Sequence, residues 1–295
     1  IILWILTLTR IVRYPARLLG DLSNHRIGSG FLTIVAATNV LGSQFVILQS
    51  NQTIALVLWV LGLALWLLLT YAIFTAFTVK EEKPSLEEGI NGAWLLFIVS
   101  TQSIPVLGML LVSRFEAWQE MFTFAMLGFY LLGCMFYILI IALIVYRFMF
   151  FKIEAEDMNP SYWINTGAVA ITTLAGANIL LRGHASFLAE FAPFIKGFTV
   201  FFWAAGTWWI PYLFILGAWR HFYKHYPLTY HPVYWGLVFP MGMYTVATFR
   251  LAEVLNMDFL LLIPQYFIYL ALIAWTITFY GLISHLFTAF RKSLT

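Results

Sequence analysis

Residues 54–79 read IALVLWVLGLALWLLLTYAIFTAFTV and contain no Asp, Glu, Lys, Arg or His. About 20 predominantly apolar residues let an α-helix cross the hydrocarbon core of a bilayer, so this stretch predicts a transmembrane helix. The whole chain agrees, because 62% of its 295 residues are hydrophobic and only 10% are charged, whereas soluble domains carry about 25% charged residues. We therefore predict an all-α integral membrane protein in contact with lipid.

Seven further stretches have the length and apolarity of membrane helices, which gives eight expected spans in chain order. Their short connections make neighbouring spans antiparallel and leave no room for a soluble domain, so residues 1–295 are expected to form a single transmembrane domain. The spans are Ile27–Leu48, Ile54–Val79, Ala93–Val112, Met121–Phe148, Trp163–Leu181, Phe194–Trp219, Val233–Val254 and Leu262–Phe287.

The first residues, Ile1–Leu8, are apolar but too few to span a bilayer, and Arg10 and Arg13 follow them. They have neither the basic start nor the small-residue cleavage site of a signal peptide. We interpret them as the end of a membrane helix whose beginning precedes Ile1, so that the chain is truncated at its N-terminus.

Most of the 16 Lys and Arg residues fall on one side of the expected membrane. Cytoplasmic loops are enriched in basic residues, so this side, with the C-terminus, is predicted to face the cytoplasm at the cell membrane. Its basic residues are Arg10, Arg13, Arg17, Arg26, Lys80, Lys83, Arg147, Lys152, Arg220, Lys224, Arg291 and Lys292; the opposite side has Arg114, Arg182, Lys196 and Arg250. No basic stripe is present, so a nucleic-acid partner is not expected.

The spans alternate in character along the chain. The first, third, fifth and seventh carry the polar residues, glycines and prolines, whereas the others are rich in Leu, Ile, Phe, Trp and Tyr. Polar side chains are costly in lipid, so the odd spans are predicted to form an inner ring and the even spans an outer one. A competing interpretation is that small and polar residues simply join helices to one another.

No Asp, Glu, Lys, Arg or His lies in the middle of any span. A pore lined by hydroxyls, amides and backbone would suit rapid passage of anions, because no carboxylate repels the ion and no fixed cation traps it. The pore-lining candidates are Asn39, Thr101, Gln102, Pro105, Thr172, Thr173, Gly236 and Gly242.

A different class of function, a membrane-bound metal-dependent enzyme, would use His221, His225 and His231, because an i, i+4 histidine pair can bind a metal. The simpler interpretation is a wet, basic loop at the membrane interface. The chain has no glycine-rich phosphate loop, nucleophile elbow or CxxC pair, so no cofactor is expected.

One stretch carries a resemblance to a known family. Residues 235–248, WGLVFPMGMYTVAT, resemble the ninth helix of the tellurite-resistance/dicarboxylate transporter family, and residues 10–15, RIVRYP, resemble the end of its second helix. The family includes tellurite-resistance protein A, fungal malate and sulfite transporters and plant slow anion channels. The resemblance implies ten helices in five hairpins around a central pore, with the odd helices inside, and a homotrimer. The eight spans would be helices three to ten.

The resemblance also implies passage of small anions, either C4-dicarboxylates such as malate or inorganic anions, through a pore gated by a phenylalanine. A proton-coupled dicarboxylate carrier stays as the alternative. The matching phenylalanine here is Phe239. Pro240 cannot donate to the carbonyl of Gly236, so the helix is expected to bend there and to push Phe239 toward the pore axis. Phe239 and Pro240 are the predicted gate.

Overall fold

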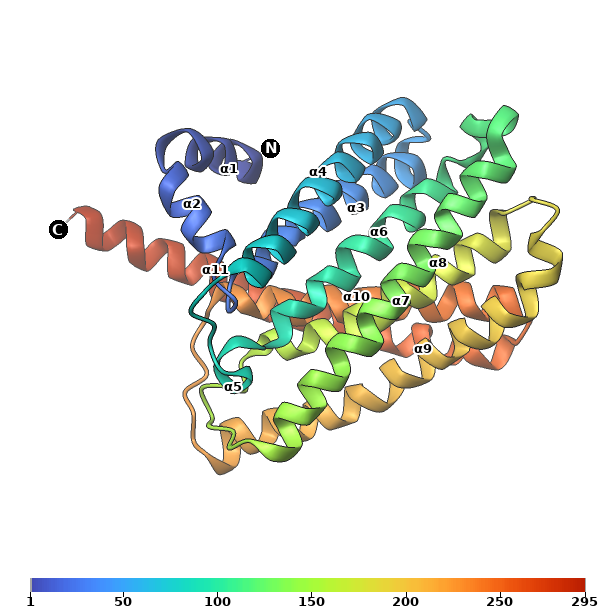
Figure 1. The fold of residues 1–295 in the computed structure, drawn as a ribbon. Coiled ribbons are helices and arrows are strands. Elements are labelled where there is room, and N and C mark those ends of the chain that lie inside the picture. The colour runs from blue at the N-terminus through green and yellow to red at the C-terminus, as the bar shows by residue number, and fades with distance from the viewer. Residues whose placement is uncertain (1, 295) are drawn as a thin grey trace.

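The computed structural model describes residues 2–294, and the side chains of residues 4–291. Within these residues every regular element is helical (Figure 1). All eight expected spans are present as long helices, with ends that shift by a few residues. These helices are α3 (Thr33–Gln49), α4 (Gln52–Val79), α6 (Leu96–Leu110), α7 (Gln119–Phe150), α8 (Ile164–Arg182), α9 (Leu188–Ala218), α10 (Trp235–Leu255) and α11 (Leu262–Leu294).

Seven of these helices, with the short turns that continue them, are long and apolar enough to cross a membrane. The chain is thus a multi-pass membrane protein. The eighth, α10, contains Arg250 and Glu253 and does not meet this measure, although the sequence places it among the spans. The N-terminal α1 (Ile2–Arg13) and α2 (Pro15–Leu22) are too short to cross and pack against each other.

The remaining elements are short. They connect or extend the long helices and comprise α5 (Leu86–Gly89), the 3-10 turns η1 (Gly28–Leu32), η2 (Gly92–Leu95), η3 (Val112–Trp118), η4 (Pro160–Trp163), η6 (Pro232–Tyr234) and η7 (Asp258–Leu261), and the π-helical turn η5 (Trp219–Tyr223).

The long helices pack as consecutive antiparallel hairpins, α3–α4, α6–α7, α8–α9 and α10–α11. One member of each hairpin also contacts its counterpart in the next, so that α3, α6, α8 and α10 form a continuous inner row. The hydrophobic windows of the α6 and α8 spans are 89% and 83% buried, against 28% for α4 and 11% for α11. The predicted inner position is therefore confirmed for α6 and α8, whereas the α3 window is 39% buried, close to the 33% of the α7 span.

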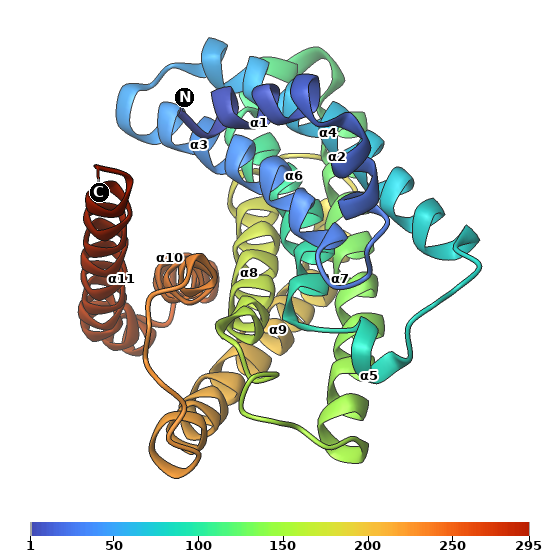
Figure 2. The ribbon, with the colours of Figure 1, turned by 90° about the vertical axis from the view of Figure 1, so that its left-hand side faces the viewer.

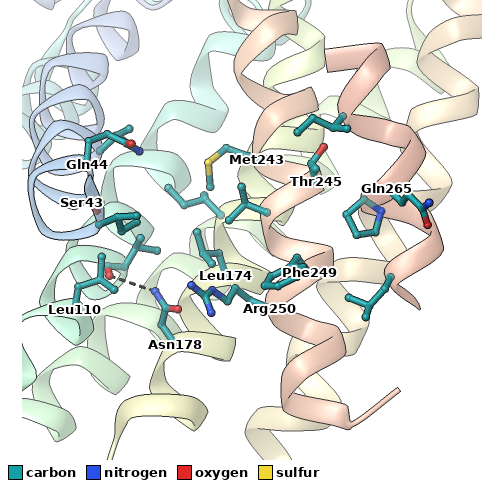
Figure 3. A pocket seen from close by; sticks show the side chains of 18 residues that line it. Ser43, Gln44, Leu110, Leu174, Asn178, Met243, Thr245, Phe249, Arg250 and Gln265 are labelled. Atoms are coloured by element: carbon teal, nitrogen blue, oxygen red, sulfur yellow. Dashed lines mark hydrogen bonds between the residues drawn. The ribbon is translucent and has the colours of Figure 1, made fainter. Parts of the chain in front are cut away.

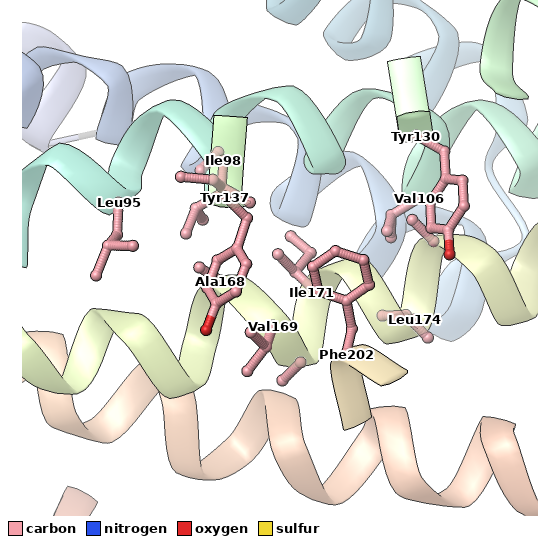
Figure 4. Packing of buried hydrophobic residues seen from close by; sticks show 14 of the residues in the cluster. Leu95, Ile98, Val106, Tyr130, Tyr137, Ala168, Val169, Ile171, Leu174 and Phe202 are labelled. Carbon is pink, nitrogen blue, oxygen red and sulfur yellow. The ribbon is translucent and has the colours of Figure 1, made fainter. Parts of the chain in front are cut away.

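Aromatic side chains of the outer helices fill the space behind the inner row (Figure 4). Tyr130 and Tyr137 reach in from α7 and Phe202 from α9, and all three are almost completely buried. Tyr130 shares a hydrogen bond with Thr199 of α9 at 3.2 Å, and the rings of Tyr137 and Phe202 meet edge to face at 5.4 Å. These contacts hold the inner helices against the outer helices α7 and α9.

All four inner helices run in the same direction, because each is the first member of its hairpin. They begin at the end of the bundle that faces the viewer in Figure 2. Each begins with a 3-10 turn, and these turns, η1, η2, η4 and η6, contact one another in that order. The chain thus places four helix N-termini side by side.

Candidate functional site

A cavity of about 800 Å³ lies between the inner helices and α11, and we call it the large cavity (Figure 3). Most of its wall is aliphatic or aromatic. The lining residues are Val40, Ser43, Gln44 and Ile47 of α3, Val106 and Leu110 of α6, Ile171, Leu174 and Asn178 of α8, Met243, Thr245, Val246, Phe249 and Arg250 of α10, Leu261 of η7, and Pro264, Gln265 and Ile268 of α11.

The large cavity has one formal charge among the described residues that line it, the guanidinium of Arg250. Its Nη1 donates to Oε2 of Glu253 at 2.7 Å, one turn further along α10 and outside the lining. Asn178 projects from α8 near the same end and donates from Nδ2 to the carbonyl of Val106 at 3.3 Å. The cavity therefore offers an anion a cation and amides, with no carboxylate in its wall.

One face of α10 runs along the large cavity. Met243, Val246 and Arg250 lie on it, and their spacing of three and four residues keeps them on one side of the helix. Phe239 is four residues before Met243 and continues the same stripe. Sequence reasoning named Phe239 but did not assign the other three to a site, because their spacing marks a shared face of α10 without indicating what that face borders.

Phe239 lies against α8 where that helix has a glycine. A Cβ at Gly167 would be 3.2 Å from Cε1 of Phe239 and 3.0 Å from Cγ of Pro240, so a side chain there would crowd both. Gly236 also faces α8, since a Cβ there would lie 3.4 Å from Ile164. The start of α10 is therefore pressed closely against α8.

A second cavity, the small cavity, has a volume of about 500 Å³ and lies where the inner helices begin. Along η4 and α8 the order is Ser161 in the wall of the small cavity, Gly167 against Phe239, and Ile171 in the wall of the large cavity. At 1.5 Å per residue these steps are roughly 9 Å and 6 Å. Along the helix axis, the contact between Phe239 and Gly167 thus lies between the levels of Ser161 and Ile171.

Three of the sequence-predicted pore residues lie elsewhere. Trp66 of α4 donates to Thr101 Oγ1 at 2.9 Å, and Gln102 donates to the carbonyl of Tyr130 in α7 at 2.9 Å. Asn39 donates to Ser103 Oγ at 2.9 Å and lies against Gly62 of α4. These buried amides and hydroxyl join the inner helices to each other and to the outer layer. They line neither cavity, and these contacts favour the competing interpretation, so their place in the pore wall stays a prediction.

Other predicted residues are buried without lining either cavity. The hydroxyls of Thr172 and Thr173 donate hydrogen bonds to the carbonyls of Ala168 and Val169, one turn before them in α8. Pro105 is buried within α6. Gly242 differs, because a Cβ there would meet no atom within 4 Å, so open space adjoins α10 at that position.

Two of the three histidines of the basic loop, His221 and His231, form local hydrogen bonds. Nδ1 of His221 hydrogen-bonds with the carbonyl of Tyr226 at 2.9 Å, and Nδ1 of His231 accepts from the N–H of Val233 at 3.3 Å. Among the residues that the structure describes, no three His, Cys, Asp or Glu side chains gather where they could hold a metal. The geometry gives no support to the metal-enzyme alternative.

Comparison with known proteins gives a consistent result. The family described as "voltage-dependent anion channel" matches residues 1–283. An uncharacterised transporter of Methanocaldococcus jannaschii is 26% identical over 279 residues, which cover 94% of this chain and 79% of that protein. An uncharacterised membrane protein of Mycobacterium tuberculosis is 35% identical over 157 residues, 53% of this chain and 80% of that protein. No solved structure matches.

Proposed function

This chain belongs to the voltage-dependent anion channel family, and on that premise we propose that small anions cross the membrane between its inner helices, past the ring of Phe239. The pathway comprises the small cavity, the contact between Phe239 and Gly167, and the large cavity. Family membership supports anion transport in general. The route and the closing ring are our assignment.

The observation that carries this proposal is the charge of the large cavity. Its wall has Arg250 and no carboxylate among the described lining residues, so its fixed charge favours an anion over a cation. The guanidinium is already paired with Glu253, which weakens its hold on a passing ion. Because conduction requires an ion to leave as well as to enter, a partly neutralised cation suits passage better than a free one.

Phe239 is the residue that we assign to closure. Its ring is partly buried against the apolar core and touches α8 at the glycine that separates the two cavities. Pro240 follows it, is buried, and removes one backbone hydrogen bond from α10 at this level. An apolar ring in a narrow passage excludes water and raises the barrier to an ion, so a small movement of the ring would open the path.

We also propose an orientation in which the inner helices begin at the cytoplasmic side. The outer helices α4, α7, α9 and α11 end there, and most basic residues of the chain lie at the same end. The positive-inside rule favours this orientation, with the C-terminus in the cytoplasm.

Anion flux from liposomes tests the proposed function. Liposomes that contain the purified protein and are loaded with chloride, nitrate, sulfite or malate should release at least one of these anions faster than protein-free liposomes. They should keep potassium at the protein-free rate, because the large cavity has a positive wall. Release of all four anions at the protein-free rate would rule the proposal out, and the pattern of released anions identifies the substrate class.

A further inference from the structure

The N-termini of the four inner helices lie together at the same end of the bundle. Their first turns, η1, η2, η4 and η6, lie in mutual contact at the end of the pathway opposite Arg250. The first N–H groups of a helix have no partner within it, and each helix start carries the equivalent of about half a positive charge. Four such starts therefore give this end a positive field that the side-chain charges alone do not reveal.

The small cavity lies at this convergence. Its wall includes one residue near the start of each inner helix: Gly30 of η1, Ala93 of η2, Ser161 of η4 and Val233 of η6. Caps hold these starts in place. Asn91 Oδ1 accepts from the N–H of Ala93 at 2.8 Å, and Asn159 Oδ1 accepts from the N–H of Ser161 at 2.9 Å.

Ser161 supplies an observation independent of the helix ends. The residue is 7% exposed and lines the small cavity, and its buried Oγ has no hydrogen-bond partner. A buried hydroxyl without a partner is costly, so a ligand that accepts its proton is favoured there. An anion is such an acceptor, and a hydrogen bond to a charged group is stronger than one between neutral groups.

Charged side chains of both signs also line the small cavity. Arg147 is committed within the protein, because it donates to the carbonyl of Glu87 and the hydroxyl of Tyr162 and pairs with Asp157 at 3.3 Å. Two of the carboxylates are exposed, so water and salt screen them, whereas Ser161 is buried. The charged lining residues are Arg26, Arg147, Glu87, Glu88, Glu156 and Asp157.

We propose that the small cavity is a weak docking site for a small anion on its way to Phe239. The hydroxyl of Ser161 donates to the anion, and the four helix starts supply the field that holds it. The wall has two arginines and four carboxylates, so its side-chain charge opposes that field and the anion does not stay bound. This inference rests on the proposed function and adds the residues that select the ion at this end of the pathway.

Replacing Asn159 by Asp tests the site with little risk to folding. Asp is as good a helix cap as Asn, so Asn159→Asp keeps the acceptor for Ser161 and adds one negative charge to the cavity wall. Asn51→Asp is the matched control. Asn51 caps α4 by accepting from the N–H of Ile54 at 3.0 Å, on an outer helix whose start lies at the opposite end of the bundle.

The measurement is the chloride concentration that gives half-maximal flux in liposomes. Asn159→Asp and Ser161→Ala should each raise it by roughly tenfold, because each weakens the hold on the anion, while Asn51→Asp should leave it unchanged. If all three variants keep the half-saturating concentration of the unmodified protein, the docking site is wrong and the proposed function stands. If the unmodified protein itself carries no anion, both are wrong.

Discussion

The ring of Phe239 in α10 lies against Gly167 in α8, so closely that a Cβ at position 167 would be 3.2 Å from its Cε1 atom and 3.3 Å from its Cδ1 atom. In the pathway that we propose, this contact lies between the cavity at the start of the inner helices and the large cavity that ends near Arg250. Two helices that are distant in sequence would thereby form the constriction.

The contact predicts that Gly167→Ala increases anion flux. The added methyl group takes the place on α8 where the ring now lies, so the closed position of Phe239 becomes strained. If the ring is the common target, Gly167→Ala combined with Phe239→Ala should conduct no more than Phe239→Ala alone, because coupled residues do not act additively. Flux from liposomes measures all three variants.

Gly128→Ala is the control for this prediction. Gly128 lies in α7, and a Cβ there would meet nothing within 4 Å. It makes the same exchange in a helix interior without crowding any neighbour. Equal flux from Gly128→Ala, Gly167→Ala and the unmodified protein would show that the contact between Phe239 and Gly167 does not control anion passage.

Much of the fold follows from polarity along the chain. Runs without charge, such as residues 54–79, predicted the spans, and the concentration of polar residues in alternate spans predicted which helices lie inside. Both follow from the cost of placing polar groups in lipid. The ends of helices were less certain, and α9 begins at Leu188 rather than near Phe194 because Pro193 is accommodated inside it.

The pore wall was harder to predict, since polarity alone does not say which neighbour a side chain meets. Thr101 and Gln102 are buried as expected, yet their partners are Trp66 and Tyr130 of the outer helices. In lipid a hydroxyl or amide serves equally well as a link between helices. Met243 and Val246 are apolar and gave no signal of their own. Their place became clear only once one face of α10 was known to border a cavity.

The orientation predicts which side of the membrane the loop between α4 and α5 faces. Lys83 lies in this loop, exposed, at the end where the inner helices begin. With Cys134 replaced by Ala, Lys83→Cys should react with a membrane-impermeant thiol reagent only after the cells are opened. Labelling of Lys83→Cys in intact cells would reverse the orientation.

Flux should depend little on a proton gradient. The described residues that line the large cavity include no Asp, Glu or His, and the carboxylates of the pathway are confined to the small cavity, so no group beyond the ring of Phe239 can take up and release a proton during passage. Malate and chloride flux should therefore be the same with and without a pH difference across liposomes at a fixed membrane potential. Uptake that requires inward proton movement would instead favour a proton-coupled dicarboxylate carrier.

The control for the closing ring needs care, because phenylalanines on the outer helices are not equivalent. Phe202 of α9 lies on an outer helix, but it is completely buried against Tyr137. Phe202→Ala would leave a cavity in the core and cost about 3–5 kcal/mol of stability. Phe201, its neighbour in α9, is 52% exposed toward the surface of the bundle and is the better control.

The most direct measurement is chloride flux through Phe239→Ala and Phe201→Ala in liposomes, with thermal unfolding in detergent to show that both variants are folded. If the pathway is as proposed, removing the ring at position 239 joins the two cavities, and the flux of Phe239→Ala should rise about tenfold or more, as expected when a barrier falls by at least roughly 1.4 kcal/mol. Phe201→Ala should conduct like the unmodified protein. If folded Phe239→Ala also conducts at the unmodified level, anions do not pass this ring and the pathway assigned here is wrong.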